Sequence, residues 1–138
     1  MKKILLALLP VAAITFMALK PAIDPIPLGA SLPSSDVKMQ DISGQEVSLS
    51  DVKTEKGLLV MFSCNTCPYV IKNQSRTYEV CKYANGMGVG VALLNSNEAK
   101  RGDDDSFEEM KKYANAQGYH WKYLVDKNHK LADAFGAN

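Results

Sequence analysis

Apolar residues in the second half of the chain are concentrated in three short runs. The runs cover residues 58–62, 89–94 and 123–125, and each is bounded by polar residues or glycine. Runs of this length are typical of strands that are buried on both faces of a mostly parallel sheet. The pattern therefore predicts three strands at the centre of one domain.

A segment whose apolar residues have helical spacing follows each run. The first covers residues 67–84. Asp105 can cap the second, with Glu108 completing a capping box, and Asn128 can cap the third, which ends at Gly136. Strands that alternate with helices of this size predict an α/β domain with right-handed crossovers.

Apolar and polar residues alternate before the first run, around residues 37–39 and 47–49, with Ser43-Gly44 between them. Such alternation around a turn signal is typical of a β-hairpin. The predicted fold class is therefore α/β, with an N-terminal hairpin followed by β-α-β-α-β-α in one domain over residues 36–138. This length suits one hydrophobic core and is too short for two.

The N-terminal segment has a different pattern. Lys2 and Lys3 precede an uncharged stretch over residues 4–19, as in the n-region and h-region of a secretory signal. We expect residues 1–20 to be a signal peptide or an uncleaved N-terminal membrane anchor, and the domain to be extracytoplasmic, either periplasmic or anchored facing the periplasm. Four prolines disfavour regular structure in residues 21–35, so this stretch is predicted to be a linker.

The motif SCNTCP at residues 63–68 joins the first predicted strand to the first predicted helix. Cys64 would lie where free backbone N–H groups and the helix dipole stabilise a thiolate, the nucleophile of disulfide exchange. Cys67, one turn further in, would be more covered and would resolve the mixed disulfide formed by Cys64. Pro68 fits the first helical turn, where its missing N–H has no partner. We therefore predict a redox pair.

Three other kinds of site use closely spaced cysteines. A structural zinc site needs about four ligands, and His120 and His129 lie far along the chain without metal-binding spacing. A c-type haem site needs His directly after the second cysteine, where this chain has Pro68. A purely structural disulfide stays open in an exported protein, although the junction favours a redox role. We expect no metal and no cofactor. The formal net charge of +1 gives no reason to expect a nucleic-acid partner.

The remaining candidate residues have simpler interpretations. On a continuous helix Cys81 would share a face with Cys67 but lie roughly 20 Å away, too far for a disulfide. It is interpreted as a buried core cysteine, and the alternative is a second resolving or intermolecular thiol. Residues 95–97, Asn-Ser-Asn, either border the cysteine pair or form a simple loop. The acidic residues 103–105 are interpreted as helix capping rather than as a cation site. Trp121 is expected to pack in the core, and the histidines to be solvent-facing or structural.

The segment from Gly57 to Val70, GLLVMFSCNTCPYV, resembles the active-site segment of the redoxin branch of the thioredoxin-like superfamily, which is related to AhpC/TSA proteins. VALLNSN, DSFEEMKKYA and LVDKNHKLADAFGA are also similar to that group, so the resemblance covers about residues 36–138. It implies a thioredoxin-like fold, with Cys64 as the attacking and Cys67 as the resolving thiol. It also implies a thiol–disulfide oxidoreductase that acts on protein or small-molecule thiols and disulfides and uses a redox partner protein.

One departure from that group concerns peroxide chemistry. Peroxiredoxins place Thr three residues and Pro seven residues before the peroxidatic cysteine. Counted from Cys67, those positions hold Cys64 and Val60; counted from Cys64, they hold Met61 and Gly57. Peroxidase activity is therefore less favoured, and a peroxiredoxin-like thiol peroxidase is kept as the alternative enzyme. A non-catalytic thioredoxin-like binding module is the alternative that is not an enzyme.

A second departure concerns the C-terminal part of the fold. Thioredoxin-like proteins carry a cis-proline opposite the CxxC motif, and no proline follows Pro68 in this chain. The group would continue past Gly136 with that loop, a closing hairpin and a last helix. We expect a C-terminally truncated member that lacks the closing hairpin and last helix.

Overall fold

The structure is a computed structural model that describes residues 24–137. At its centre is a parallel sheet of three strands, in the order β3 (Leu58–Ser63), β4 (Gly90–Asn95) and β5 (Lys122–Val125). All six residues of β4 are buried, as expected for a central strand that is covered on both faces. The three predicted apolar runs are therefore the three strands.

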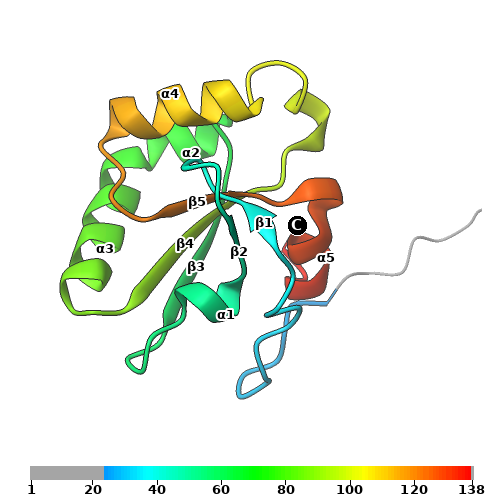
Figure 1. Ribbon diagram of the computed structural model, residues 1–138, viewed down its shortest axis with the longest axis vertical. Helices are drawn as coiled ribbons and strands as arrows, with labels where there is room; N and C mark the ends of the chain where they lie inside the picture. Colours follow the sequence, from blue (N-terminus) through cyan, green and yellow to red (C-terminus); the bar gives the residue numbers. More distant parts are fainter. Residues whose placement is uncertain (1–23, 138) are drawn as a thin grey trace, which may run out of the picture.

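Helices cover both faces of this sheet (Figure 1). On one face lie α3 (Gln74–Gly86), which follows the short α2 (Pro68–Lys72), and α4 (Phe107–Gln117). The other face carries α1 (Leu49–Val52), α5 (Lys130–Phe135) and the hairpin of β1 (Met39–Gln40) and β2 (Glu46–Val47). Two 3-10 turns, Glu98–Lys100 and Lys127–His129, complete the described elements.

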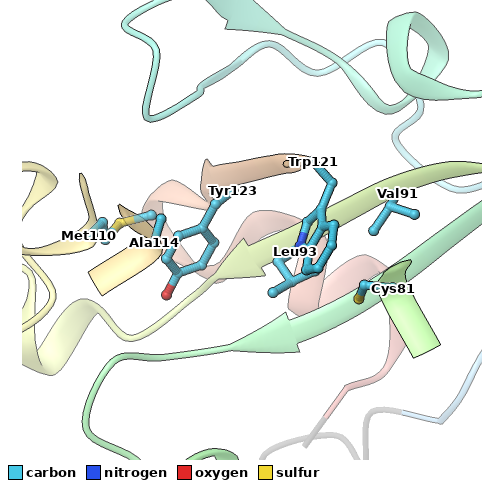
Figure 2. Close-up of a cluster of buried hydrophobic side chains, with 7 residues drawn as sticks. All are labelled: Cys81, Val91, Leu93, Met110, Ala114, Trp121 and Tyr123. Carbon is cyan, nitrogen blue, oxygen red and sulfur yellow. The ribbon is translucent and has the colours of Figure 1, made fainter. Parts of the chain in front are cut away.

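Alternate residues of β4 point into two separate hydrophobic clusters. Val91 and Leu93 belong to the cluster under α3 and α4, whereas Ala92 and Leu94 belong to the cluster under α1 and α5. This division follows from the pleat of a strand, whose successive side chains point to opposite faces. Figure 2 shows the first cluster, which contains Cys81, Val91, Leu93, Met110, Ala114, Trp121 and Tyr123.

The N-terminal hairpin is present but shorter than predicted. β1 pairs antiparallel with β2, with Met39 opposite Val47. Leu49, expected in the second strand, instead begins α1 and is fully buried there. The reason is a capping box: the Ser48 hydroxyl accepts a hydrogen bond from the Asp51 N–H, and the Asp51 carboxylate accepts one from the Ser48 N–H.

The helix predicted over residues 67–84 is divided into two. The break is at Asn73, whose φ of −101° and ψ of 7° are not helical. Its side chain donates a hydrogen bond to the Tyr69 carbonyl, the kind of local contact by which asparagine competes with helix formation. Contrary to the prediction, Cys67 and Cys81 therefore do not lie on one continuous helix.

Two predicted helix caps are also wrong. Asp105 does not cap α4, whose N-cap position is occupied by Ser106 without a side-chain hydrogen bond, and Glu108 completes no capping box. Asn128 does not cap α5 either. The buried carboxylate of Asp126 instead accepts hydrogen bonds from two N–H groups in the first turn of α5. In both places the buried carboxylate has a role that its neighbours in sequence did not indicate.

The predicted leader, residues 1–20, lies outside the described residues. Within residues 24–137, no helix is long and apolar enough to cross a membrane. The described part of the predicted linker, residues 24–35, contains neither helix nor strand. It contacts the end of α5, because the Ile26 N–H donates to the Phe135 carbonyl at 3.3 Å.

Candidate active site

The Cys64–Cys67 pair lies in the loop between β3 and α2, at the edge of the sheet where the parallel strands end. The two residues form a disulfide, with their Cα atoms 5.7 Å apart. Cys67 occupies the N-cap position of α2, and Pro68 stands in the first turn. The strand–CxxC–helix junction that the sequence predicts is therefore present.

The two cysteines differ in exposure, in the opposite sense to the prediction. Cys64 is 2% exposed, whereas Cys67 is half-buried. The reason is that hydrogen bonds draw Asn65, next to Cys64, into the domain, while Cys67 begins a helix with no buried residue. The Cys67 N–H lies 3.0 Å from Sγ of Cys64. A donor at this position would stabilise negative charge on the Cys64 sulfur.

Asn65, between the two cysteines, is held by three hydrogen bonds to distant parts of the chain. Its backbone N–H donates to Oδ1 of Asp105 at 2.7 Å, and its Nδ2 donates to the carbonyl of Asp104 at 2.8 Å. Its Oδ1 accepts from the hydroxyl of Tyr123 at 2.9 Å. Thr66, the other intervening residue, is exposed. The loop is therefore fixed on its Asn65 side and open to solvent on its Thr66 side.

Asp105 is the centre of this network. Its carboxylate is fully buried, and Oδ1 accepts from Asn95 Nδ2 at 2.6 Å as well as from the Asn65 N–H. Oδ2 accepts from Asn97 Nδ2 at 2.7 Å. The cluster at residues 95–97 therefore borders the cysteine loop, and one of the two predicted interpretations of it is confirmed.

Arg101 connects the loop that carries Asp105 to the end of β4 through hydrogen bonds. Its guanidinium donates to the backbone carbonyls of Asp105 at 3.0 Å and Asn95 at 2.6 Å. The other two carboxylates of the acidic cluster 103–105 pair with Lys100 at the surface. The acidic cluster therefore divides into a buried acceptor and two exposed charges.

Tyr123 is a member of the network that sequence reasoning missed, because its residue type and its place in β5 indicated only packing. Its hydroxyl donates to Asn65 and accepts from Asn95 Nδ2 at 3.1 Å. Burial, and to a smaller extent the charge of Asp105, raises the pKa of Tyr123 above its ordinary value. The hydroxyl therefore keeps its proton and remains a donor to Asn65.

Cys81 is a buried core cysteine, as predicted. It is fully buried in α3, and its sulfur lies 3.7 Å from that of Met61 (Figure 2 shows its place in the cluster). Burial raises the pKa of the Cys81 thiol to about 11. A protonated, covered thiol is a poor nucleophile, so Cys81 takes no part in the site.

The remaining predictions for single residues concern His120, His129 and Trp121. Both histidines are exposed, and Nδ1 of His129 lies 3.2 Å from the Ser96 carbonyl oxygen. Trp121 packs in the core, stacked on Tyr119, which confirms the packing interpretation. Among residues 24–137, no three His, Cys, Asp or Glu side chains are grouped so that they could hold a metal ion.

A shallow groove of about 320 Å³ lies beside the cysteine loop. Its walls come from the loop on one side and from α4 and the residues before it on the other. The lining residues are Asn65, Thr66, Asp104, Glu109, Lys112, Tyr113 and Ala116. The exposed side of the CxxC loop thus faces a space in which part of a substrate can lie.

A fold of this kind with two cysteines at the strand–helix junction is thioredoxin-like, which confirms the predicted fold class. Residues 28–138 match the model of the AhpC/TSA family, and the chain belongs to this family. No protein of curated function matches the chain. The family and the fold together support a thiol-based redox function.

The solved structures that resemble the chain include the following three. A hypothetical protein from Sinorhizobium meliloti is 28% identical, with a TM-score of 0.65 over 78% of this chain and 60% of that one. An uncharacterized conserved protein from Geobacillus kaustophilus is 35% identical, with a TM-score of 0.61 over 76% of this chain and 57% of that one. Peroxiredoxin Q from Xanthomonas campestris shares the fold, with 16% identity and a TM-score of 0.59 over 76% and 63%. The chain therefore spans less than two thirds of each of these proteins.

Proposed function

We propose that this protein is a thiol–disulfide oxidoreductase that exchanges the Cys64–Cys67 dithiol and disulfide with protein or small-molecule substrates. The observation that carries the proposal is the disulfide at the β3–α2 junction, with Cys67 half-buried rather than covered and a groove beside Asn65 and Thr66, the residues between the two cysteines. A structural disulfide would not need an open groove beside the residues between its cysteines. A separate redox partner protein would restore the pair after each turnover.

In the reducing direction, the Cys64 thiolate attacks one sulfur of a substrate disulfide. A mixed disulfide forms, and the first substrate thiol leaves with a proton from solvent. Cys67, as its thiolate, then attacks Sγ of Cys64, which closes the intramolecular disulfide and releases the second substrate thiol. Two electrons pass to the substrate. The Cys67 N–H, 3.0 Å from Sγ of Cys64, supports Cys64 as the attacking thiol.

Single serine variants test these roles. Cys64→Ser should abolish reduction of insulin disulfides, while Cys67→Ser should accumulate mixed disulfides that a non-reducing gel detects. Cys81→Ser is the matched control and should keep full activity, because Cys81 is buried away from the pair. Full activity of Cys64→Ser would exclude the mechanism. If instead Cys67→Ser is inactive without trapping and Cys64→Ser traps the substrate, the two roles are exchanged.

Peroxide reduction is the second candidate function, and the AhpC/TSA family supports it. Thiol-dependent consumption of hydrogen peroxide that is lost in Cys67→Ser or Cys64→Ser would favour it. The Met61 and Gly57 positions, which lack the peroxiredoxin Thr and Pro, make this activity the less favoured one.

A non-catalytic binding module would show no redox-dependent alkylation of Cys64.

We also propose that the domain acts outside the cytoplasm. The support is the sequence of residues 1–20, in which Lys2 and Lys3 precede an uncharged stretch. A reporter enzyme that is active only after export, fused behind residue 35, should be active in cells. Replacing Leu5 and Leu8 by Arg should abolish reporter activity, because charges in the apolar stretch prevent insertion. Equal activity of both fusions would contradict the proposed location.

A further inference from the structure

The carboxylate of Asp105 is surrounded by donors and has both oxygens in use. Oδ1 accepts from the Asn65 N–H and Asn95 Nδ2, and Oδ2 accepts from Asn97 Nδ2. The orientation of the Asn95 amide is set independently, because its Oδ1 accepts from the Asn97 N–H at 3.1 Å. Only a group that accepts at both oxygens satisfies all three donors, and a carboxylate is such a group.

This carboxylate contacts the residue that directly follows Cys64, on whose sulfur negative charge forms. It binds the N–H of Asn65, the residue that follows Cys64, and both Asp105 and Cys64 are buried. Charges that are shielded from water interact strongly, so the carboxylate disfavours a thiolate at Cys64. The same charge acts on the Tyr123 hydroxyl, which binds Asn65: Asp105 contributes to raising the pKa of Tyr123.

The other groups around Asp105 reduce this effect without removing it. Arg101 contributes a cation, but its guanidinium binds the Asp105 backbone carbonyl at 3.0 Å. Asp104 faces the loop through its own carbonyl, and its carboxylate lies at the surface within 3.5 Å of Lys100. The amide of Asn97 donates a hydrogen bond to Oδ2 at 2.7 Å, which stabilises part of the carboxylate charge.

We propose that Asp105 is a positioning residue for the Cys64–Cys67 pair: it holds the loop through Asn65, and its charge favours the disulfide over the dithiol. The inference rests on the proposed function. When the dithiol reduces a substrate disulfide, the intramolecular disulfide closes and two substrate thiols leave, carrying the two electrons. Closing the disulfide removes the Cys64 thiolate and its repulsion from Asp105. The residue therefore biases the protein towards reducing its substrates.

The equilibrium between the pair and glutathione tests this inference. Asp105→Asn keeps the size of the side chain and removes the charge, so its disulfide should become at least tenfold easier to reduce, about 30 mV for a two-electron couple. The midpoint of Cys64 alkylation with pH, measured in the Cys67→Ser background, should move to lower pH. Asp103→Asn is the matched control. It removes the charge of an exposed side chain two residues before Asp105, so neither the reduction equilibrium nor the alkylation midpoint should change.

Asn97→Ala separates the effect of charge from a loosened loop. It removes a hydrogen bond that stabilises the carboxylate and keeps the charge, so the disulfide should become harder to reduce, the opposite of the Asp105→Asn result. This variant also keeps the inference testable if Asp105→Asn does not fold. Shifts of both variants in the same direction, or no shift in either, would overturn the inference. Failure of the unaltered protein to exchange with glutathione at all would instead overturn the proposed function.

Discussion

At the scale of the residue, burial decides what a side chain can do. Asp103 and Asp105 lie two positions apart, yet Asp103 pairs with Lys100 in solvent while Asp105 is fully buried among three donors. The cysteines show the same dependence. Cys64 and Cys81 are both buried, but only Cys64 has a backbone N–H directed at its sulfur. Residue type alone does not distinguish these environments.

Cys81 allows a prediction about stability and pH. Its thiol has a pKa raised from 9.0 to about 11 by burial. A group whose pKa is higher in the folded protein than in the unfolded protein contributes its full stabilisation at pH values below the unfolded pKa. This contribution is lost as the pH rises towards the folded pKa. The difference in unfolding free energy between the protein and its Cys81→Ala variant should therefore shrink between pH 9 and pH 11, as measured by urea unfolding.

Alkylation provides the check on this explanation. With the Cys64–Cys67 disulfide intact, Cys81 should resist iodoacetamide at pH 8 in the folded protein and react in urea. Equal reaction rates in both conditions would contradict the burial of the thiol. A constant difference in unfolding free energy across the pH range would contradict the raised pKa.

At the scale of the element, close contact between α1 and β4 positions the hairpin side of the sheet. A Cβ atom at Gly90 would lie 2.0 Å from the carbonyl oxygen of Val52 at the end of α1. Such a separation is not possible, so either the helix or the strand would have to move. The small residue at the start of β4 is therefore required by the packing of α1.

Gly90→Ala should destabilise the protein by about 1–3 kcal/mol, the usual cost of overpacking a core. Gly86→Ala, at the end of α3, is the control, because no atom lies within 4 Å of its Cβ position. That variant should be neutral or slightly stabilising. Chemical denaturation of both variants measures the difference. Equal stabilities would contradict the close approach of α1 to β4.

At the scale of the whole molecule, β4 connects two hydrophobic clusters on opposite faces of one sheet. Leu93 belongs to one cluster and Leu94 to the other, and both side chains are fully buried. Because the clusters share a strand, we expect them to unfold together rather than one after the other. Trp121 belongs to the Leu93 cluster, so its fluorescence reports on that face alone.

Leu94→Ala should destabilise the protein by about 2–5 kcal/mol through the cavity that it leaves. The fluorescence of Trp121, on the other face, should lose its native signal at the same denaturant concentration as the far-UV circular dichroism. Leu93→Ala, whose side chain lies in the same cluster as Trp121, serves as the comparison and should behave in the same way. Separate transitions by the two probes would show that the faces unfold independently.

The sequence by itself determined the three strands, their alternation with helices, the hairpin and the CxxC junction. These features depend on interactions between neighbours in the chain: the period of apolar residues, turn residues, and a proline tolerated in the first turn of a helix. Where a local side-chain contact competed with the expected one, as at Ser48 and Asn73, the element boundaries differed from the prediction.

Only the tertiary structure decided how the cysteine pair is supported. Asn65 binds Asp105 across 40 residues and Tyr123 across 58, and these contacts make Cys64 the more covered cysteine. Such contacts exist because the parallel sheet brings the ends of β3, β4 and β5 to one edge, with the loop before α4 folded over it. No periodicity in the chain encodes a hydrogen bond between side chains that meet only after three strands have paired.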